Sequence, residues 1–176
     1  MKPAIRFTLP LACLAALTTM VGGDPEPQPQ INFTQAGLGT FKADWQGVAG
    51  RTYFTQFSLD HVTWRYAPFI DFGGDPHNRG LDSTSNTFFV RLRWGDISAY
   101  TSLDQAMNGH LDGDGLSNIF EVTYGYDPFE NTSTTDGPDG EVDPDDDGLG
   151  NASEQAGGSN PMAMDNPIVQ LEVTVE

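Results

Sequence analysis

The distribution of charge along the chain limits how its second half can fold. Residues 100–176 contain seventeen acidic side chains and neither Lys nor Arg, whereas residues 24–99 contain eight acidic and six basic side chains. A segment with so much charge of one sign repels itself and needs a source of positive charge in order to collapse. Its lack of basic residues also excludes nucleic acid as a partner, because phosphate binding requires clustered cations.

The first 23 residues have the pattern of a secretory signal peptide. Lys2 and Arg6 precede an apolar run that ends at Val21 and is followed by two glycines. We expect cleavage after Gly23. The mature protein would be secreted and would be either extracellular or attached to the cell surface. The one cysteine, Cys13, lies in this segment, so the mature chain would have no disulfide.

Lipidation at Cys13 is a less favoured alternative, because the apolar run continues well past the cysteine. No later stretch contains the 18 or more apolar residues that a membrane-spanning helix needs. We therefore expect no transmembrane segment.

The rest of the chain is expected to be mainly β. Residues 24–39 are rich in Pro and Gln and predict a flexible linker, and alternating apolar residues predict a small antiparallel sheet or sandwich-like module over residues 40–101. Four strands are expected, over residues 41–45, 53–59, 64–72 and 88–94, with the first two forming a hairpin. Pro68 indicates an edge strand or a bulge. Residues 73–85 are expected to be a loop, and Arg91 and Arg93 to lie on an exposed polar face.

Such a module is near the lower size limit for an independent core, so we expect it to be stabilised by packing against the rest of the chain. Residues 102–165 would form irregular EF-hand-like loops with short helical turns. Residues 166–176 alternate apolar and polar side chains and are predicted to add a closing C-terminal strand.

An aspartate-rich segment occurs twice, at a spacing of 33 residues. Residues 112–121 and 145–154 align without a gap, and each is followed by a glycine and then by Tyr-Asp-Pro or Ser-Asn-Pro. The internal spacing is that of a twelve-residue calcium loop, in which positions 1, 3, 5, 9 and 12 supply side-chain oxygens and position 7 its carbonyl. Because only oxygen is offered, Ca²⁺ is the expected ion.

The second loop fills every ligand position. The predicted ligands are Asp143, Asp145, Asp147, the Leu149 carbonyl, Asn151 and Glu154.

The first loop departs from this pattern at its first position. Its predicted ligands are Asp112, Asp114, the Leu116 carbonyl, Asn118 and Glu121. His110 stands where the first aspartate is expected, and imidazole is a poor calcium ligand. Asn108, Asp104 or an acid from a neighbouring loop are candidates to replace it, and Asp136, Asp139 and Asp146 are further acids close in sequence.

These loops, with Gly-x-Asp-Pro or Gly-x-Asn-Pro after the glutamate, resemble thrombospondin type 3 repeats of bacterial exported proteins. The resemblance spans about residues 108–163 and implies acidic loops wound around calcium ions, used as a rigid spacer or in cell adhesion. The preceding aromatic module resembles a small β module found before such repeats in exported proteins of environmental bacteria, on the basis of Trp45, the Gly-Arg-Thr-Tyr-Phe turn at residues 50–54, Gln56, Ser58, Asp60, Trp64 and the Phe-Phe-Val-Arg-Leu segment at residues 88–92. Dockerins have similar loops, but residues 122–128 and 155–161 are too short and too rich in Gly and Pro for the dockerin helix.

No motif of a known catalytic site is present, so a non-catalytic protein is expected. The main alternative is a β module that binds a cell-surface glycan or protein, with the repeats as its stalk. Trp45, Trp64 and Trp94 are candidates for stacking on a sugar, although their even spacing favours a role in the core.

Overall fold

The computed structural model describes residues 29–164 apart from positions 38, 86 and 98. Within this part of the chain, six strands form two antiparallel three-stranded sheets, and three short helices follow. The first sheet has the order β1-β2-β5, with β1 Ile31–Gly37, β2 Thr40–Gln46 and β5 Pro76–Asp82. The second has the order β4-β3-β6, with β4 Arg65–Phe72, β3 Thr52–Ser58 and β6 Phe89–Trp94. The helices are α1 Leu103–Asn108, α2 Asn118–Tyr124 and α3 Asn151–Gly157, and the prediction of a mainly β fold with short helical segments is confirmed.

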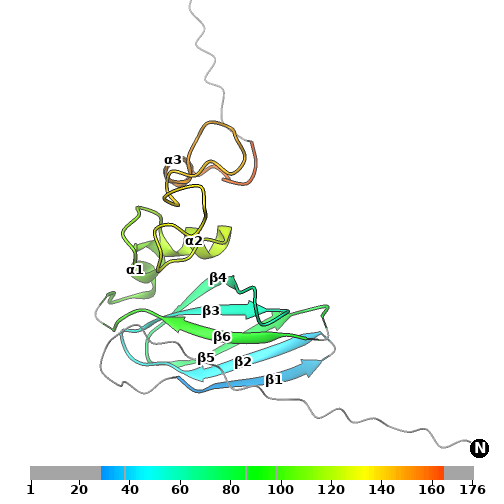
Figure 1. Ribbon diagram of the computed structural model, residues 1–176. Coiled ribbons are helices and arrows are strands. Elements are labelled where there is room, and N and C mark those ends of the chain that lie inside the picture. The colour runs from blue at the N-terminus through cyan, green and yellow to red at the C-terminus, as the bar shows by residue number, and fades with distance from the viewer. Residues whose placement is uncertain (1–28, 38, 86, 98, 165–176) are drawn as a thin grey trace, which may run out of the picture.

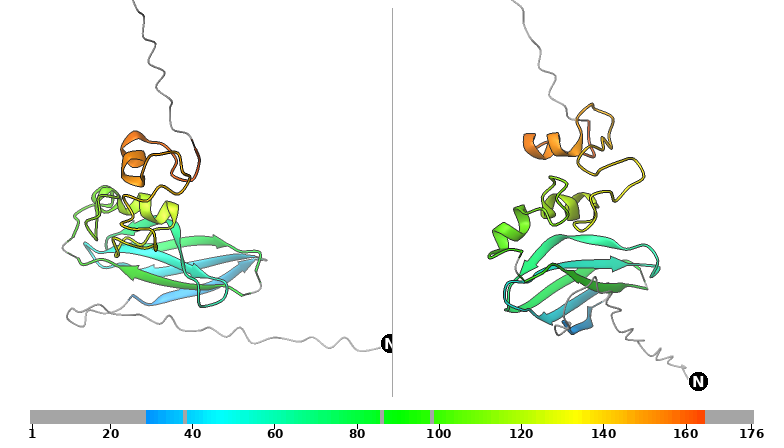
Figure 2. Two further views of the ribbon diagram at one scale, coloured as in Figure 1. Left: turned by 45° about the horizontal axis from the view of Figure 1, so that its top comes forward. Right: turned by 60° about the vertical axis from the view of Figure 1, so that its left-hand side comes forward.

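The molecule is layered, with the second sheet in the middle (Figures 1 and 2). One face of this sheet packs on the first sheet through a core that includes Trp45, Tyr53 and Leu92. Its other face packs on α1 and α2 through a second core that includes Phe54, Ala106 and Val122. The expectation that the β module packs against the rest of the chain is thus confirmed for these two helices.

The predicted hairpin of the first two strands is wrong. β2 and β3 belong to different sheets, and the chain crosses between the sheets at residues 47–51. Gly47 permits the tight crossing, because a Cβ there would lie 2.1 Å from the Gly73 carbonyl oxygen. Trp45 and Tyr53 do meet, but across the two layers, with ring centroids 6.1 Å apart. Apolar alternation shows which residues of a strand lie on its buried face. It does not show whether two consecutive strands pair in one sheet or lie in two sheets that pack against each other.

Two strands were not expected. β1 lies in the predicted linker of residues 24–39, and β5 lies in the predicted loop of residues 73–85. Both are edge strands that flank β2. In β1 the apolar alternation is limited to Ile31 and Phe33, and in β5 Leu81 is the one large apolar side chain. Neither strand therefore has the longer alternation that identifies a strand in a sequence. The folded module therefore begins at Ile31 rather than near Thr40.

The expected irregularity at Pro68 is confirmed. Phe54 pairs with Ile70, but Gln56 pairs with Tyr66, so edge strand β4 has two extra residues at this point.

The prediction of an exposed arginine face is wrong, since Arg91 and Arg93 are half-buried under the acidic repeats. Arg93 donates a hydrogen bond to the Tyr66 hydroxyl at 2.6 Å and pairs with Asp127. The acidic half thus receives part of its counter-charge from the second sheet. The predicted signal peptide of residues 1–23, the start of the predicted linker and the predicted closing strand of residues 166–176 lie outside the described residues.

Candidate metal centre

The two aspartate-rich loops have the same backbone course. Gly115 and Gly148, at the sixth position of each loop, have φ of 96° and 93°. Two residues earlier, Gly113 and Asp146 also lie in the left-handed region, with φ of 82° and 61°. A side chain is disfavoured there, although Asp tolerates it better than most residues. The repeat seen in the sequence is therefore also a repeat in conformation.

Three aspartates each use one carboxylate oxygen to accept a backbone hydrogen bond within their own loop. Oδ1 of Asp112 accepts from the backbone N–H of Asp114 at 3.2 Å, and Oδ1 of Asp114 accepts from that of Leu116 at 2.7 Å. In the second loop, Oδ1 of Asp145 accepts from the N–H of Asp147 at 3.1 Å. The other oxygen, Oδ2, of Asp112, Asp114 and Asp145 is buried without a hydrogen-bond partner. These oxygens are available to a cation.

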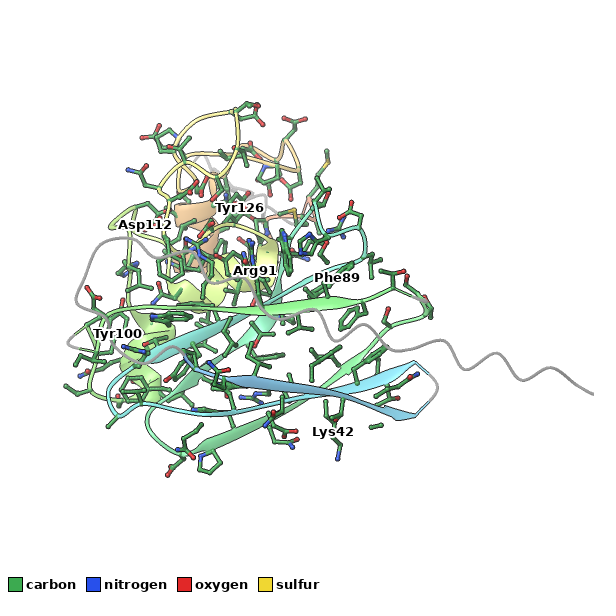
Figure 3. The ribbon with its side chains drawn as sticks, turned by 60° about the horizontal axis from the view of Figure 1, so that its bottom comes forward. Lys42, Phe89, Arg91, Tyr100, Asp112 and Tyr126 are labelled. Atoms are coloured by element: carbon green, nitrogen blue, oxygen red, sulfur yellow. The ribbon has the colours of Figure 1, made fainter. Side chains whose placement is uncertain are left out.

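The loops gather their acids into two groups. Asp112, Asp114 and Glu121 form one, in which one ligand atom from each lies within 4.8 Å of the others. Asp143, Asp145 and Asp147 form the other by the same measure. Glu154 is fully buried but is not part of the second group. Figure 3 shows Asp112 in the loop region above the second sheet.

Glu121 is the most unusual residue of the two groups. Its side chain is 0% exposed, and neither carboxylate oxygen has a hydrogen-bond partner. Burial, followed by the charges of Asp112 and Asp114, raises the pKa of this carboxyl to about 9. A carboxylate in this position needs a cation to be stable in its charged form.

The glutamates are held by short helices that start three residues before them. The Ser117 side chain caps α2, while Gly150 occupies the equivalent position before α3. Both helices end at a glycine in the left-handed conformation, Gly125 or Gly158, whose N–H donates to the glutamate carbonyl at 2.8 or 2.7 Å. These ends explain the glycines that the sequence repeats four residues after each glutamate.

Asn118 and Asn151 have a structural role that the sequence did not reveal. The Asn118 amide donates to the Ala106 carbonyl at 2.7 Å, and its Oδ1 accepts from the N–H of Leu111 at 3.1 Å. The Asn151 amide donates in the same way to the Asp139 carbonyl at 2.6 Å. Both residues are fully buried. They join each loop to the segment that precedes it, and their assignment as calcium ligands stays a prediction.

His110 contacts a predicted ligand instead of replacing the missing acid. Its Nδ1 forms a hydrogen bond with the Leu116 carbonyl, the predicted ligand at position 7 of the first loop. Two of the suggested replacements, Asp104 and Asn108, bond to each other on α1, with 2.9 Å between the Asn108 amide nitrogen and the Asp104 carbonyl oxygen. In the second loop, the Leu149 carbonyl is the counterpart of the Leu116 carbonyl, and it remains a predicted ligand.

Two further acids matter to the site. Asp139 is fully buried between the loops, where it accepts from the N–H of Ser133 at 2.7 Å and raises the pKa of Glu121. Asp127 accepts from the Tyr66 hydroxyl at 2.8 Å and pairs with Arg93. The only sequence signal for Asp127 was its place in the Gly-Tyr-Asp-Pro segment, whose counterpart in the second repeat is Gly-Ser-Asn-Pro.

No protein-family model matches the chain, and no curated protein matches it significantly. Among the described residues, no helix has the length and apolar character required to cross a membrane. The interpretation of the site therefore depends on its own geometry.

Proposed function

We propose that this chain is an exported, non-catalytic calcium-binding protein, in which thrombospondin type 3-like repeats act as a structural spacer or adhesion-type module. The main support is Glu121, a fully buried carboxylate with two unpartnered oxygens beside Asp112 and Asp114. A divalent cation would compensate this buried negative charge.

The donor set favours Ca²⁺ over other divalent cations. The grouped atoms in both loops are carboxylate oxygens, which hard cations prefer. Calcium accepts six to eight oxygens in a flexible arrangement, and carbonyls and water can complete its shell. Magnesium demands a nearly octahedral arrangement and gives up its water reluctantly.

The packing of the repeats supports a structural role for the ion. The Gln155 side chain on α3 accepts from the N–H of Ser117 at 2.7 Å and donates to the Gly115 carbonyl at 3.1 Å. This links the second loop to the first, while α2 packs on the second sheet through Val122. Calcium would therefore stiffen a continuous path from the β module to α3.

Calorimetric titration of the mature chain with CaCl₂, together with melting curves with and without EDTA, tests the proposal. We expect about two ions per chain and a dissociation constant of about 0.1–1 mM, as in extracellular modules. With about 1 mM calcium and a dissociation constant of about 0.1 mM, each site would add roughly 1.4 kcal/mol of stability. Identical melting curves with and without EDTA and a flat titration would refute the proposal.

A further inference from the structure

A groove runs between the second sheet and the turn that follows α2. It has a volume of about 510 Å³, within the range of about 300–1,000 Å³ that is usual for ligand sites. One wall comes from β3, β4 and the residues before β4, and the other comes from α2 and residues 125–133. The groove therefore lies at the contact between the β module and the first repeat, and neither segment forms it alone.

Aromatic side chains from both walls line this groove. Trp64 and Tyr66 come from the sheet side, while Tyr124 and Tyr126 come from the repeat side. Trp64 and Tyr124 are half-buried, so part of each ring faces solvent. The other two tryptophans differ, because Trp45 is in the core and Trp94 packs against it. Of the three predicted stacking candidates, the structure leaves Trp64 in a position to meet a ligand.

Hydrogen bonds and stacking hold the walls in place. The Arg91 guanidinium lies 4.0 Å from the centre of the Trp64 ring, and its Nε donates to the Gln56 carboxamide at 2.7 Å. Across the groove, the Tyr66 hydroxyl donates to Asp127. Figure 3 shows Arg91 on the sheet and Tyr126 above it on the repeat. A site whose side chains are already fixed loses less entropy when it binds a ligand.

The charges of this groove are balanced, unlike those of the chain. Arg93 neutralises Asp127, and the remaining charged lining residues are the exposed Arg65 and Glu130, one of each sign. The chain as a whole has a formal charge of -17. A strongly ionic ligand would gain little here, because each fixed charge has an opposite charge to offset it.

We propose that this groove binds a neutral oligosaccharide. The C–H faces of sugar rings pack on aromatic side chains, and hydroxyl groups pair with the guanidinium and carboxylate groups of the exposed Arg65 and Glu130. A peptide would also meet these aromatic rings and could pair with the edge strand β4. The polar side chains of the lining suit sugar hydroxyls better than apolar side chains, and the peptide ligands below test this alternative. The site is independent of the calcium proposal, since its walls are protein groups alone.

The full chain, in calcium-containing buffer, is titrated with neutral hexasaccharides that differ in linkage, such as cellohexaose, xylohexaose, mannohexaose and chitohexaose. Hexalysine and an uncharged Gly-Ser-Tyr peptide serve as competing ligand classes. Tryptophan fluorescence reports contact at Trp64, and calorimetry gives the affinity. We expect binding of at least one saccharide and of neither peptide.

Three groove variants and two matched controls test the location. Trp64→Ala should weaken saccharide binding about tenfold, and Arg65→Ala and Glu130→Ala about threefold each. Lys42→Ala, on the first sheet away from the groove, and Glu141→Ala, an exposed acid outside it, should change nothing. Circular dichroism checks folding, and the two exposed residues keep the test valid if Trp64→Ala unfolds the protein.

Failure to bind any saccharide at millimolar concentration would overturn the proposal, as would preferential binding of either peptide. Equal losses in the groove variants and the controls would show that the saccharide binds elsewhere. Repeating the titration in EDTA separates this inference from the calcium proposal, because calcium binding can fail while saccharide binding persists.

Discussion

The two acidic loops share a sequence pattern and a backbone conformation but differ in their surroundings. The second has every predicted ligand and stands away from the sheets with α3 (Figure 1). The first lacks an acid at position 110 but lies against the second sheet through Leu111 and Val122, whereas Glu121 and Glu154 are both fully buried. The loop with the complete set of predicted ligands is thus the loop that lies farther from the sheets. Completeness of a motif and tertiary burial are separate properties, and burial sets how much a missing cation would cost.

This difference predicts that removing the first glutamate affects more of the molecule than removing the second. Glu121→Gln should reduce calcium affinity of the first loop about 100-fold, or about 2.7 kcal/mol, and change the near-ultraviolet circular dichroism of the sandwich aromatics. Glu154→Gln should reduce affinity of the second loop by a similar factor and leave that spectrum unchanged. The comparison fails if both variants alter the spectrum equally.

The attachment of the first loop to the sheet predicts the next effect. Asp127→Ala breaks a partly buried ion pair with Arg93 and the hydrogen bond from Tyr66, which should cost about 2 kcal/mol of unfolding free energy. Asn160→Ala, at the equivalent position of the second repeat, is the matched control; it removes the hydrogen bond from the N–H of Met162 to Asn160 Oδ1 and should cost about 1 kcal/mol. Urea unfolding followed by tryptophan fluorescence measures both, and comparable losses would show that the first repeat is not specially anchored.

The raised pKa of Glu121 predicts that calcium and protons compete at the first loop. Between the unfolded pKa of 4.5 and the folded pKa of about 9, the calcium-free protein holds a proton that the unfolded chain has lost. Stability without calcium should therefore fall as pH rises through this window, whereas calcium affinity should rise by up to about tenfold per pH unit. Calorimetry in buffers of different ionisation enthalpy measures the released proton. Glu121→Gln should remove this release, and a release unchanged in that variant would assign it to another group.

His110 predicts the smallest effect and sharpens the comparison. Replacing it by aspartate should raise calcium affinity of the first loop about threefold, or about 0.7 kcal/mol, because an acid returns to position 1 and the Leu116 carbonyl loses its contact with imidazole. His110→Ala removes the contact without adding a ligand, so it should change affinity less than Glu154→Ala does. A titration in which His110→Asp binds more weakly would show that His110 stabilises the loop.

The conformation of the loops was readable from the sequence because it is local. The spacing of the acids and the left-handed glycines at positions 115 and 148 are fixed within about twelve residues. The same holds for the strands with strong apolar alternation, β2, β3, β4 and β6, which lie where the alternation placed them.

The partners of these elements were decided only by the tertiary structure. β2 and β3 pack across two sheets, and the polar edge strands β1 and β5 pair with β2 although neither has a clear periodic signal. The burial of Glu121 and the pairing of Arg93 with Asp127 depend on contacts between segments far apart in sequence. The sequence by itself determined which oxygens each loop offers, and the tertiary structure decided which of them are removed from water, because burial is a property of the assembled layers.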